Sequence, residues 1–220
     1  ITQKIKTVKY SVCNGHVYKN SVTKATTSAN GSMSKICKYC DTVKAGSKTT
    51  ISRIKNVKLS KTSYVYDGKV KNPIVSVFDA KGKKIAATNY TVTYPSGRKN
   101  AGEYKVKIVF KNNYKGTVYK TFTINPKGTS IASTSRGTKK FTVKWKKQAT
   151  QTTGYQICYG TSKNKEKGKK VTVKSYKTTS KKIRDLKRNK KYYVWVRTYK
   201  TVNGTKYYSN WSKRKYVTTR

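Results

Sequence analysis

The chain has 220 residues, of which 34% are hydrophobic, and its 53 Lys and Arg against six acidic residues give a net charge of +47. This length exceeds one ordinary sandwich domain of about 100 residues, and so few hydrophobic residues predict two or three small domains and exclude one large core. Valine, threonine and tyrosine abound, whereas leucine occurs only at Leu59 and Leu186, so the composition favours an all-β fold over a helical bundle. We find no apolar run of the roughly 18 residues needed for a membrane span.

Three of the four cysteines and the only histidine lie within residues 1–52. Two pairs with two intervening residues, Cys13 with His16 and Cys37 with Cys40, are separated by twenty residues. Such spacing is typical of a closed tetrahedral zinc site, and a small segment with little aliphatic core needs a staple of this kind. We therefore predict a zinc-ribbon-like β segment at 1–52, with a structural zinc ion as cofactor and no open coordination position for catalysis.

Two alternatives explain the same residues. Cys37 and Cys40 could form a disulfide, or the thiols could be free beside an unrelated histidine. Thioredoxin-like redox chemistry would require a strand-to-helix context around Cys37 and Cys40, and nothing in this segment predicts a helix.

Residues 53–126 contain short alternating runs bounded by turn signals at Asp67-Gly68 and Lys81-Gly82. This pattern predicts a β-sandwich, with strands near 63–66, 74–78, 90–94, 104–110 and 117–124. The segment resembles the bacterial Ig-like modules of surface proteins, through an opening motif at Tyr66, Gly68, Pro73, Val75 and Val77 and a closing motif at Asn113, Tyr114 and Gly116.

Residues 127–220 contain alternating runs at 141–145, which includes Trp145, and at 154–159. These runs resemble strand B, with its core tryptophan, and strand C of fibronectin type III domains. Leu186 is followed by a period-two series that matches the E–F corner and strand F of that family, namely Tyr192, Val194 and Val196. Arg188-Asn189 replaces the usual Pro-Gly of the corner, and the run 209–218 resembles strand G. The two modules together look like the lysine-rich ends of secreted proteins from Gram-positive gut anaerobes.

The same alternation defines a candidate binding face on the outer side of the third module. If residues 155, 157 and 159 point inward, the outer face carries Gln156, Cys158, Tyr193, Trp195, Arg197 and Tyr199. Tryptophan among tyrosine and arginine on a solvated sheet is typical of binding hot spots. The alternative is that lysine stems and neighbouring modules cover these rings.

The third module carries 28 basic and two acidic residues, hence +26. Its lysine-rich loops at 162–170 and 181–191 predict salt-sensitive attachment to anionic polymers such as teichoic acid or a charged glycan, although a solubilising lysine coat would look the same. No motif that reads bases is present, so we expect no sequence-specific nucleic-acid partner.

Catalysis is not expected. His16 is the sole histidine, the six acidic residues are scattered, and no nucleophile or phosphate-binding motif occurs. We predict a monomeric, non-catalytic extracellular protein, secreted or on the cell surface, that acts as a spacer and adhesion region for an anionic cell-wall polymer or a host glycan or protein. Two alternatives remain: a dedicated receptor for a host protein such as immunoglobulin, or for mucin glycan, through the aromatic face, and an accessory region of an extracellular hydrolase.

Overall fold

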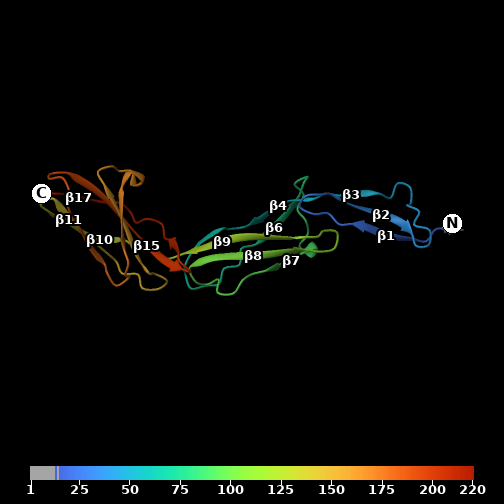
Figure 1. The fold of residues 1–220 in the computed structure, drawn as a ribbon, viewed down its shortest axis with the longest axis horizontal. Coiled ribbons are helices and arrows are strands. Elements are labelled where there is room, and N and C mark those ends of the chain that lie inside the picture. Colours follow the sequence, from blue (N-terminus) through green and yellow to red (C-terminus); the bar gives the residue numbers. More distant parts are fainter. Residues whose placement is uncertain (1–12, 14) are drawn as a thin grey trace, which may run out of the picture. The chain divides into compact units, whose positions relative to one another are not determined.

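The computed structural model describes residue 13 and residues 15–220 (Figure 1). The predicted segment 1–52 therefore begins, at residues 1–12 and 14, outside the described residues. The described chain folds into β-strands joined by turns, with two single-turn 3-10 helices, η1 (Ala87–Asn89) and η2 (Lys165–Lys167). The predicted all-β class is confirmed. Within the described part, no helix is long and apolar enough to cross a membrane.

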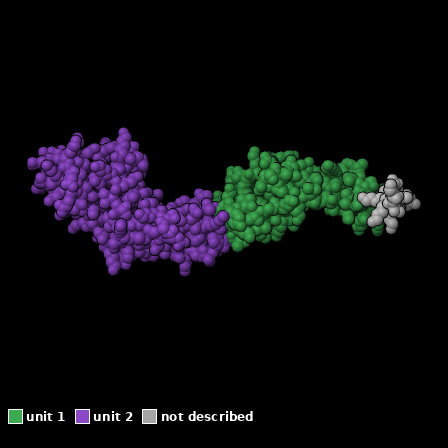
Figure 2. All heavy atoms as spheres, viewed as in Figure 1, with its two compact units in different colours: residues 1–60, 74–93, 106–120 green, residues 61–73, 94–105, 121–220 purple. Residues whose placement is uncertain are grey.

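The chain divides into two compact units, residues 1–60, 74–93 and 106–120 in one and residues 61–73, 94–105 and 121–220 in the other (Figure 2). Two long strands, β8 (Gly102–Phe110) and β9 (Thr117–Asn125), contribute residues to both units. The three-module division at 52/53 and 126/127 stays a prediction.

The first unit begins with an antiparallel three-stranded sheet, in the order β1 (Tyr18–Thr23), β2 (Gly31–Cys37) and β3 (Thr49–Ile51). Few of its side chains are buried, as expected for a segment with almost no aliphatic core.

Gly31 is required in β2, because a Cβ atom there would lie 2.2 Å from the carbonyl oxygen of Thr23. Ala25 is fully buried, and its N–H donates to the carbonyl of Asn113 at 2.9 Å, which ties the sheet to the predicted closing motif of the middle segment.

The middle segment contains two further sheets. One pairs β4 (Ile54–Leu59) with β6 (Val75–Asp79), and the other has the order β5 (Ser63–Val65), β9, β8, β7 (Tyr90–Thr93), in which β5 and β9 are parallel. Period-two alternation buries every second side chain of β6 and much of β8, including Val75, Val77, Val106, Ile108 and Phe110. All five strands predicted for this segment are present.

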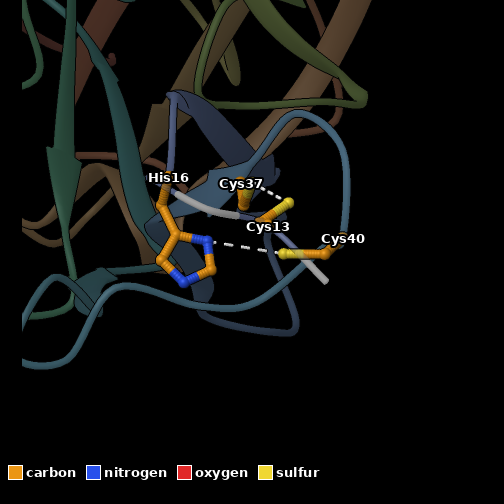
Figure 3. A group of neighbouring side chains, drawn as sticks. All are labelled: Cys13, His16, Cys37 and Cys40. Atoms are coloured by element: carbon orange, nitrogen blue, oxygen red, sulfur yellow. Dashed lines mark hydrogen bonds between the residues drawn. The ribbon is translucent and has the colours of Figure 1, made fainter. Parts of the chain in front are cut away.

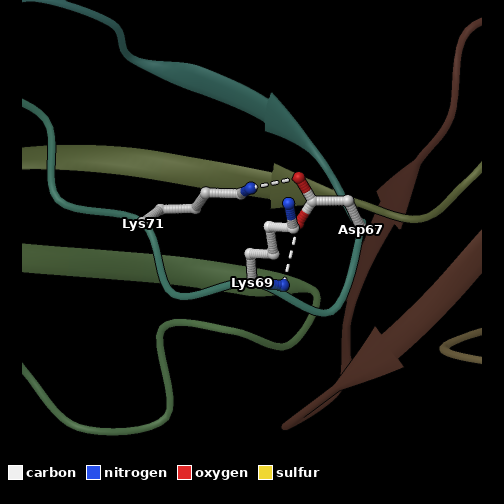
Figure 4. Close-up of polar contacts among 3 residues, drawn as sticks. All are labelled: Asp67, Lys69 and Lys71. Atoms are coloured by element: carbon white, nitrogen blue, oxygen red, sulfur yellow. Dashed lines mark hydrogen bonds and ion pairs between the residues drawn. The ribbon is translucent and has the colours of Figure 1, made fainter.

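The turn after β5 is closed by the carboxylate of Asp67 (Figure 4). Its Oδ1 accepts a hydrogen bond from the backbone N–H of Lys69 at 2.9 Å, and its Oδ2 accepts one from Nζ of Lys71 at 2.5 Å. Gly68, between them, has φ +78°, which glycine adopts without steric cost. The Lys71 ammonium also lies 5.8 Å from the centre of the Tyr64 ring, so the ion pair joins the turn to the preceding strand. The hydrogen bond from Lys71, and next the one from Lys69, lower the pKa of Asp67.

The C-terminal part of the second unit is a sandwich of two antiparallel sheets. The smaller has the order β10 (Ile131–Gly137), β11 (Lys140–Trp145), β14 (Ser180–Ile183). The larger has the order β13 (Lys169–Val173), β12 (Gly154–Gly160), β15 (Lys191–Val202), β16 (Thr205–Tyr208), and β17 (Lys215–Thr218) also pairs with β15. The shared core includes the side chains predicted to point inward, among them Trp145, Tyr155, Ile157, Tyr192, Val194 and Val196.

The E–F corner keeps its geometry despite the missing Pro-Gly. Leu186 is buried, and the hydroxyl oxygen of Tyr192 accepts a hydrogen bond from the backbone N–H of Lys187 at 3.1 Å. This is the tyrosine corner of sandwich domains. Asn189 takes the left-handed conformation, with φ +49°, which asparagine tolerates better than most residues. Arg188-Asn189 can therefore form the turn that Pro-Gly usually makes.

Candidate metal centre and outer aromatic face

The four predicted metal ligands come together at one end of the first sheet (Figure 3). Cys13 and His16 precede β1, Cys37 ends β2, and Cys40 lies in the turn that follows. The ladder register places Tyr18 opposite Cys37, so the chain entering β1 and the chain leaving β2 meet. Two further backbone bonds hold the knuckles, from Lys38 N–H to the Val17 carbonyl at 2.8 Å and from Cys37 N–H to the Thr42 carbonyl at 2.9 Å.

The distances between the donor atoms fit a tetrahedral metal ion. All four donor atoms lie within 4.8 Å of one another. The Sγ atoms of Cys13 and Cys37 are 3.7 Å apart, and Sγ of Cys40 is 3.5 Å from Nδ1 of His16. Zinc–ligand bond lengths in a regular tetrahedron imply about 3.8 Å between two sulfurs and about 3.5 Å between sulfur and nitrogen. The cluster can bind a metal. Cys37 and Cys40 do not form the alternative disulfide, since all three cysteines of the cluster are free thiols.

Hydrogen bonds lower the pKa of two of the three thiols, which favours the thiolate form that binds a cation. The backbone N–H of Tyr39 donates to Sγ of Cys37 at 3.5 Å, and this bond, supported by the His16 side chain, lowers the pKa of Cys37 to about 6. The hydroxyl of Thr42, 3.2 Å from Sγ of Cys40, likewise lowers the pKa of Cys40. The pKa of Cys13 is raised to about 12, chiefly because its protonated thiol hydrogen-bonds with Cys40 and next because of desolvation, while repulsion from the neighbouring thiolates adds a smaller contribution. A bound cation would remove that repulsion.

Three thiols and one imidazole fill all four positions of a tetrahedral ion. Thiolate and imidazole are the donors that zinc prefers, and a site with four protein ligands has no position left for water or substrate. The arrangement can therefore stabilise the fold, but it offers no activated water. Its position at the end of a sheet with few buried side chains agrees with a structural role.

The candidate binding face has the predicted side-chain alternation. Opposite pairs between β12 and β15 join Cys158 with Trp195 and Gln156 with Arg197. Cys158, Tyr193 and Trp195 form a separate cluster on the side of the sheet away from the main core, and Trp211 packs against it. The predicted orientation of these side chains is thus confirmed.

Of the two interpretations of this face, the structure supports the one in which the rings are covered. Cys158, Trp195 and Tyr199 are buried, with exposed fractions of 0%, 6% and 2%, and Gln156 and Tyr193 reach only 9%. The loop at 162–170 covers the middle of the face, since Sγ of Cys158 donates to the Lys165 carbonyl at 3.2 Å and a Cβ atom on Gly168 would lie 2.5 Å from the same sulfur. From the sequence, lysine stems and neighbouring modules are a possible cover for these rings. In the structure, the cover is a loop of the same module. Whether any of these six residues contacts a ligand stays a prediction.

The cover also includes cations stacked on the aromatic rings. The guanidinium carbon of Arg197 lies 3.9 Å from the Tyr208 ring centre and 4.3 Å from that of Trp211, and Arg214 lies 5.0 Å from Tyr193. Strand periodicity does not point to Tyr208 and Trp211, because the run 209–218 resembles a single strand in the sequence. In the structure the strands are β16 and β17, and the stretch between them crosses the outer edge of β15.

The C-terminal sandwich is the part of the chain that matches a known family model. Residues 125–215 match the family model of the fibronectin type III domain. The match confirms the resemblance predicted for the third module. No curated protein matches the sequence.

Solved structures similar to the chain include two multidomain fibronectin segments. The FN1–FN3 domains of chicken CNTN1 are 16% identical, with 87% of this chain and 77% of that chain covered and a TM-score of 0.40. A two-domain fibronectin type III segment from chicken tenascin is 18% identical, with 76% and 99% covered and a TM-score of 0.42. A β-1,2-glucanase from Parabacteroides distasonis is 14% identical, over 53% of this chain and 17% of that chain, with a TM-score of 0.35.

Proposed function

We propose that the chain is a non-catalytic extracellular spacer and adhesion region that attaches electrostatically to an anionic cell-wall polymer. The observation that carries this proposal is the excess of 53 basic over six acidic residues, of which the 94 residues from 127 onward contribute +26. Complete pairing of all six carboxylates would leave most of that charge unneutralised. A surface of this kind attracts polyanions at long range.

Burial and fold class support the proposal. The basic residues of the stretch 181–191 are all exposed, namely Lys181, Lys182, Arg184, Lys187, Arg188, Lys190 and Lys191. Fibronectin-like sandwiches are common in cell-surface proteins, where they serve as binding and spacer modules. The position on the bacterial cell surface and the monomeric state belong to the proposal.

We assign the cluster of Cys13, His16, Cys37 and Cys40 to a structural zinc ion within this proposal. The donor set and the two distances near tetrahedral values fit zinc, and the small hydrophobic core of the first sheet supports a structural role for the ion. The ion would keep the first sheet folded outside the cell.

Salt titration tests the proposed function. The full chain should bind immobilised teichoic acid, and its affinity should fall at least about tenfold between 50 and 200 mM NaCl, because each phosphate contact releases counterions. Lys187→Glu with Lys190→Glu should weaken binding more than the charge-matched pair Lys19→Glu with Lys48→Glu, whose side chains are exposed in the first unit. Salt-independent binding, or equal effects of the two pairs, would contradict the proposal. Persistent binding at high salt would favour the receptor alternative.

A further inference from the structure

A cavity of about 370 Å³ lies at the edge of the outer aromatic face, where the loop at 162–170 and the stretch 209–212 meet β15. Lys165 contributes from the loop, Trp195 and Arg197 from β15, and Asn210 and Trp211 from the stretch between β16 and β17. Volumes of this size are at the lower end of small-molecule sites in proteins, and a single sugar residue fits within them.

Both ionisable side chains that line the cavity are cations, Lys165 and Arg197. Arg197 is held in one orientation. Its Nε and Nη2 donate to Oε1 of Gln156 at 3.0 and 2.7 Å, and its guanidinium carbon lies 3.9 Å from the centre of the Tyr208 ring and 4.3 Å from that of Trp211. Little side-chain entropy is left to lose when a ligand binds, which makes the arginine a preorganised anion contact.

Several hydrogen-bond donors of the cavity have no partner among the described residues. They are Nη1 of Arg197, the indole N–H of Trp195 and the side-chain amide of Asn210. By contrast, the hydroxyls of Ser209 and Ser212 are both engaged with backbone groups. No carboxylate lines the cavity, although Oε1 of Glu166 lies 3.6 Å from Nζ of Lys165, so Arg197 is the cation of the lining without an acidic partner in the described part of the chain. Unused donors beside Arg197 favour an anion that accepts several hydrogen bonds.

The aromatic lining narrows the class of anion. Trp211 is half-buried, so part of its ring remains accessible beside the guanidinium. A ligand that combines an apolar ring face with a planar anionic group would use both surfaces, and a guanidinium matches a carboxylate in geometry better than an ammonium does. Partial burial lowers the pKa of Arg197, and a bound carboxylate would offset that cost.

We propose that this cavity binds a single carboxylated sugar unit of a glycan, with Arg197 and Lys165 as the carboxylate contacts and Trp211 as the ring contact. The inference rests on the proposed adhesive function, because it adds a discrete subsite to a surface that attracts polyanions. A sialic acid and a uronic acid share this chemistry.

Nuclear magnetic resonance of the ¹⁵N-labelled full chain tests the subsite, because its three tryptophans give separate indole signals. Methyl glycosides of sialic acid and of glucuronic acid are titrated at 150 mM NaCl, with methyl glucoside as the neutral control. One of the two acids should shift the signals of Trp211 and Trp195 in a saturable manner. The signal of Trp145, whose N–H is buried in the core without a partner among the described residues, should not move.

Surface variants give the second readout. Lys165→Ala and Asn210→Ala, which remove one cation and one donor, should each raise the dissociation constant roughly three- to tenfold. Lys163→Ala removes the same charge from an exposed position of the same loop outside the lining and should leave it unchanged. Absence of saturable shifts with both acids, equal shifts with methyl glucoside, or equal effects of Lys163→Ala and Lys165→Ala would overturn the inference.

The experiments distinguish failure of the adhesive function from failure of the sugar subsite. Salt-sensitive binding to teichoic acid without any monosaccharide response would remove the subsite and leave the adhesive function. A monosaccharide response without teichoic acid binding would support the subsite and remove the proposed cell-wall partner.

Discussion

Tyr18 lies directly opposite Cys37 in the antiparallel ladder between β1 and β2. This pairing places one end of the ladder at the metal cluster, so that the backbone hydrogen bonds and the ligand donors hold the same two chain segments. The side chains of this sheet bury little apolar surface. The stability of the first sheet should therefore depend on the metal.

Cys37→Ser is expected to abolish metal binding and unfold the first sheet. Structural zinc contributes about 10 kcal/mol or more in small zinc-finger peptides, far more than the few buried side chains of this sheet. Elemental analysis of the purified protein should give one zinc ion per chain for the natural sequence and none for the variant. Amide exchange of β1 and β2 should rise in the variant, while that of the C-terminal sandwich stays unchanged.

Cys158→Ser is the matched control, because that thiol lies in the other unit and donates to the Lys165 carbonyl, which a serine hydroxyl can also do. It should retain the metal. Equal zinc content in Cys37→Ser and the natural protein would contradict the assignment.

The metal should also be lost in acid. The lowered pKa of Cys37, about 6 in the metal-free cluster, means that the thiolate is present at neutral pH. Protons compete with the metal for the same sulfur, and the bound metal keeps the thiolate deprotonated to lower pH. Zinc release, followed with a colorimetric chelator, should therefore increase as the solution is acidified and be reversible. Full retention at pH 4 would contradict this expectation.

Arg197→Ala should destabilise the C-terminal sandwich by roughly 2–4 kcal/mol, since it removes two hydrogen bonds to Gln156 and two ring contacts. It also leaves Oε1 of the buried Gln156 without its donor. Arg214→Ala is the control, because Arg214 is exposed and lies 5.0 Å from the Tyr193 ring, and it should cost less than about 1 kcal/mol. Urea unfolding measures both. Equal losses would show that the stacked arrangement contributes nothing specific.

Local patterns in the sequence predicted two features of the structure, the core side chains of β15 and the cluster of cysteines and histidine. Period two placed Tyr192, Val194 and Val196 in the core, and the paired spacing of cysteines and histidine predicted the cluster. Both patterns act over a few residues, where chain geometry leaves few options. The strand periodicity also gave the correct side of the sheet for Trp195.

The burial of the outer side of this sheet, which carries Trp195, could not be predicted from strand periodicity. Cys158 and Trp195 are covered by the loop at 162–170 and by Trp211, and alternation along β12 and β15 contains no information about either. The parallel pairing of β5 with β9 is another long-range feature, since it joins residues 63–65 to residues 123–125. Contacts of this kind depend on where loops and distant strands pack, which a short sequence window does not encode.

Asp67→Asn should weaken the turn after β5 at neutral pH but not in strong acid. The hydrogen bond from Lys71 lowers the pKa of Asp67 below its ordinary value of 3.8, so the carboxylate is favoured by the folded state. Its stabilising effect is complete above pH 3.8 and is lost as the pH falls through the lowered folded-state value. Thermal unfolding of both proteins between pH 7 and pH 2 should show a difference in Tm that shrinks toward the acid end. Glu103→Gln, which changes an exposed carboxylate of β8, serves as the control and should alter the profile little. A Tm difference that is independent of pH would show that the side-chain shape of Asp67, and not its charge, holds the turn.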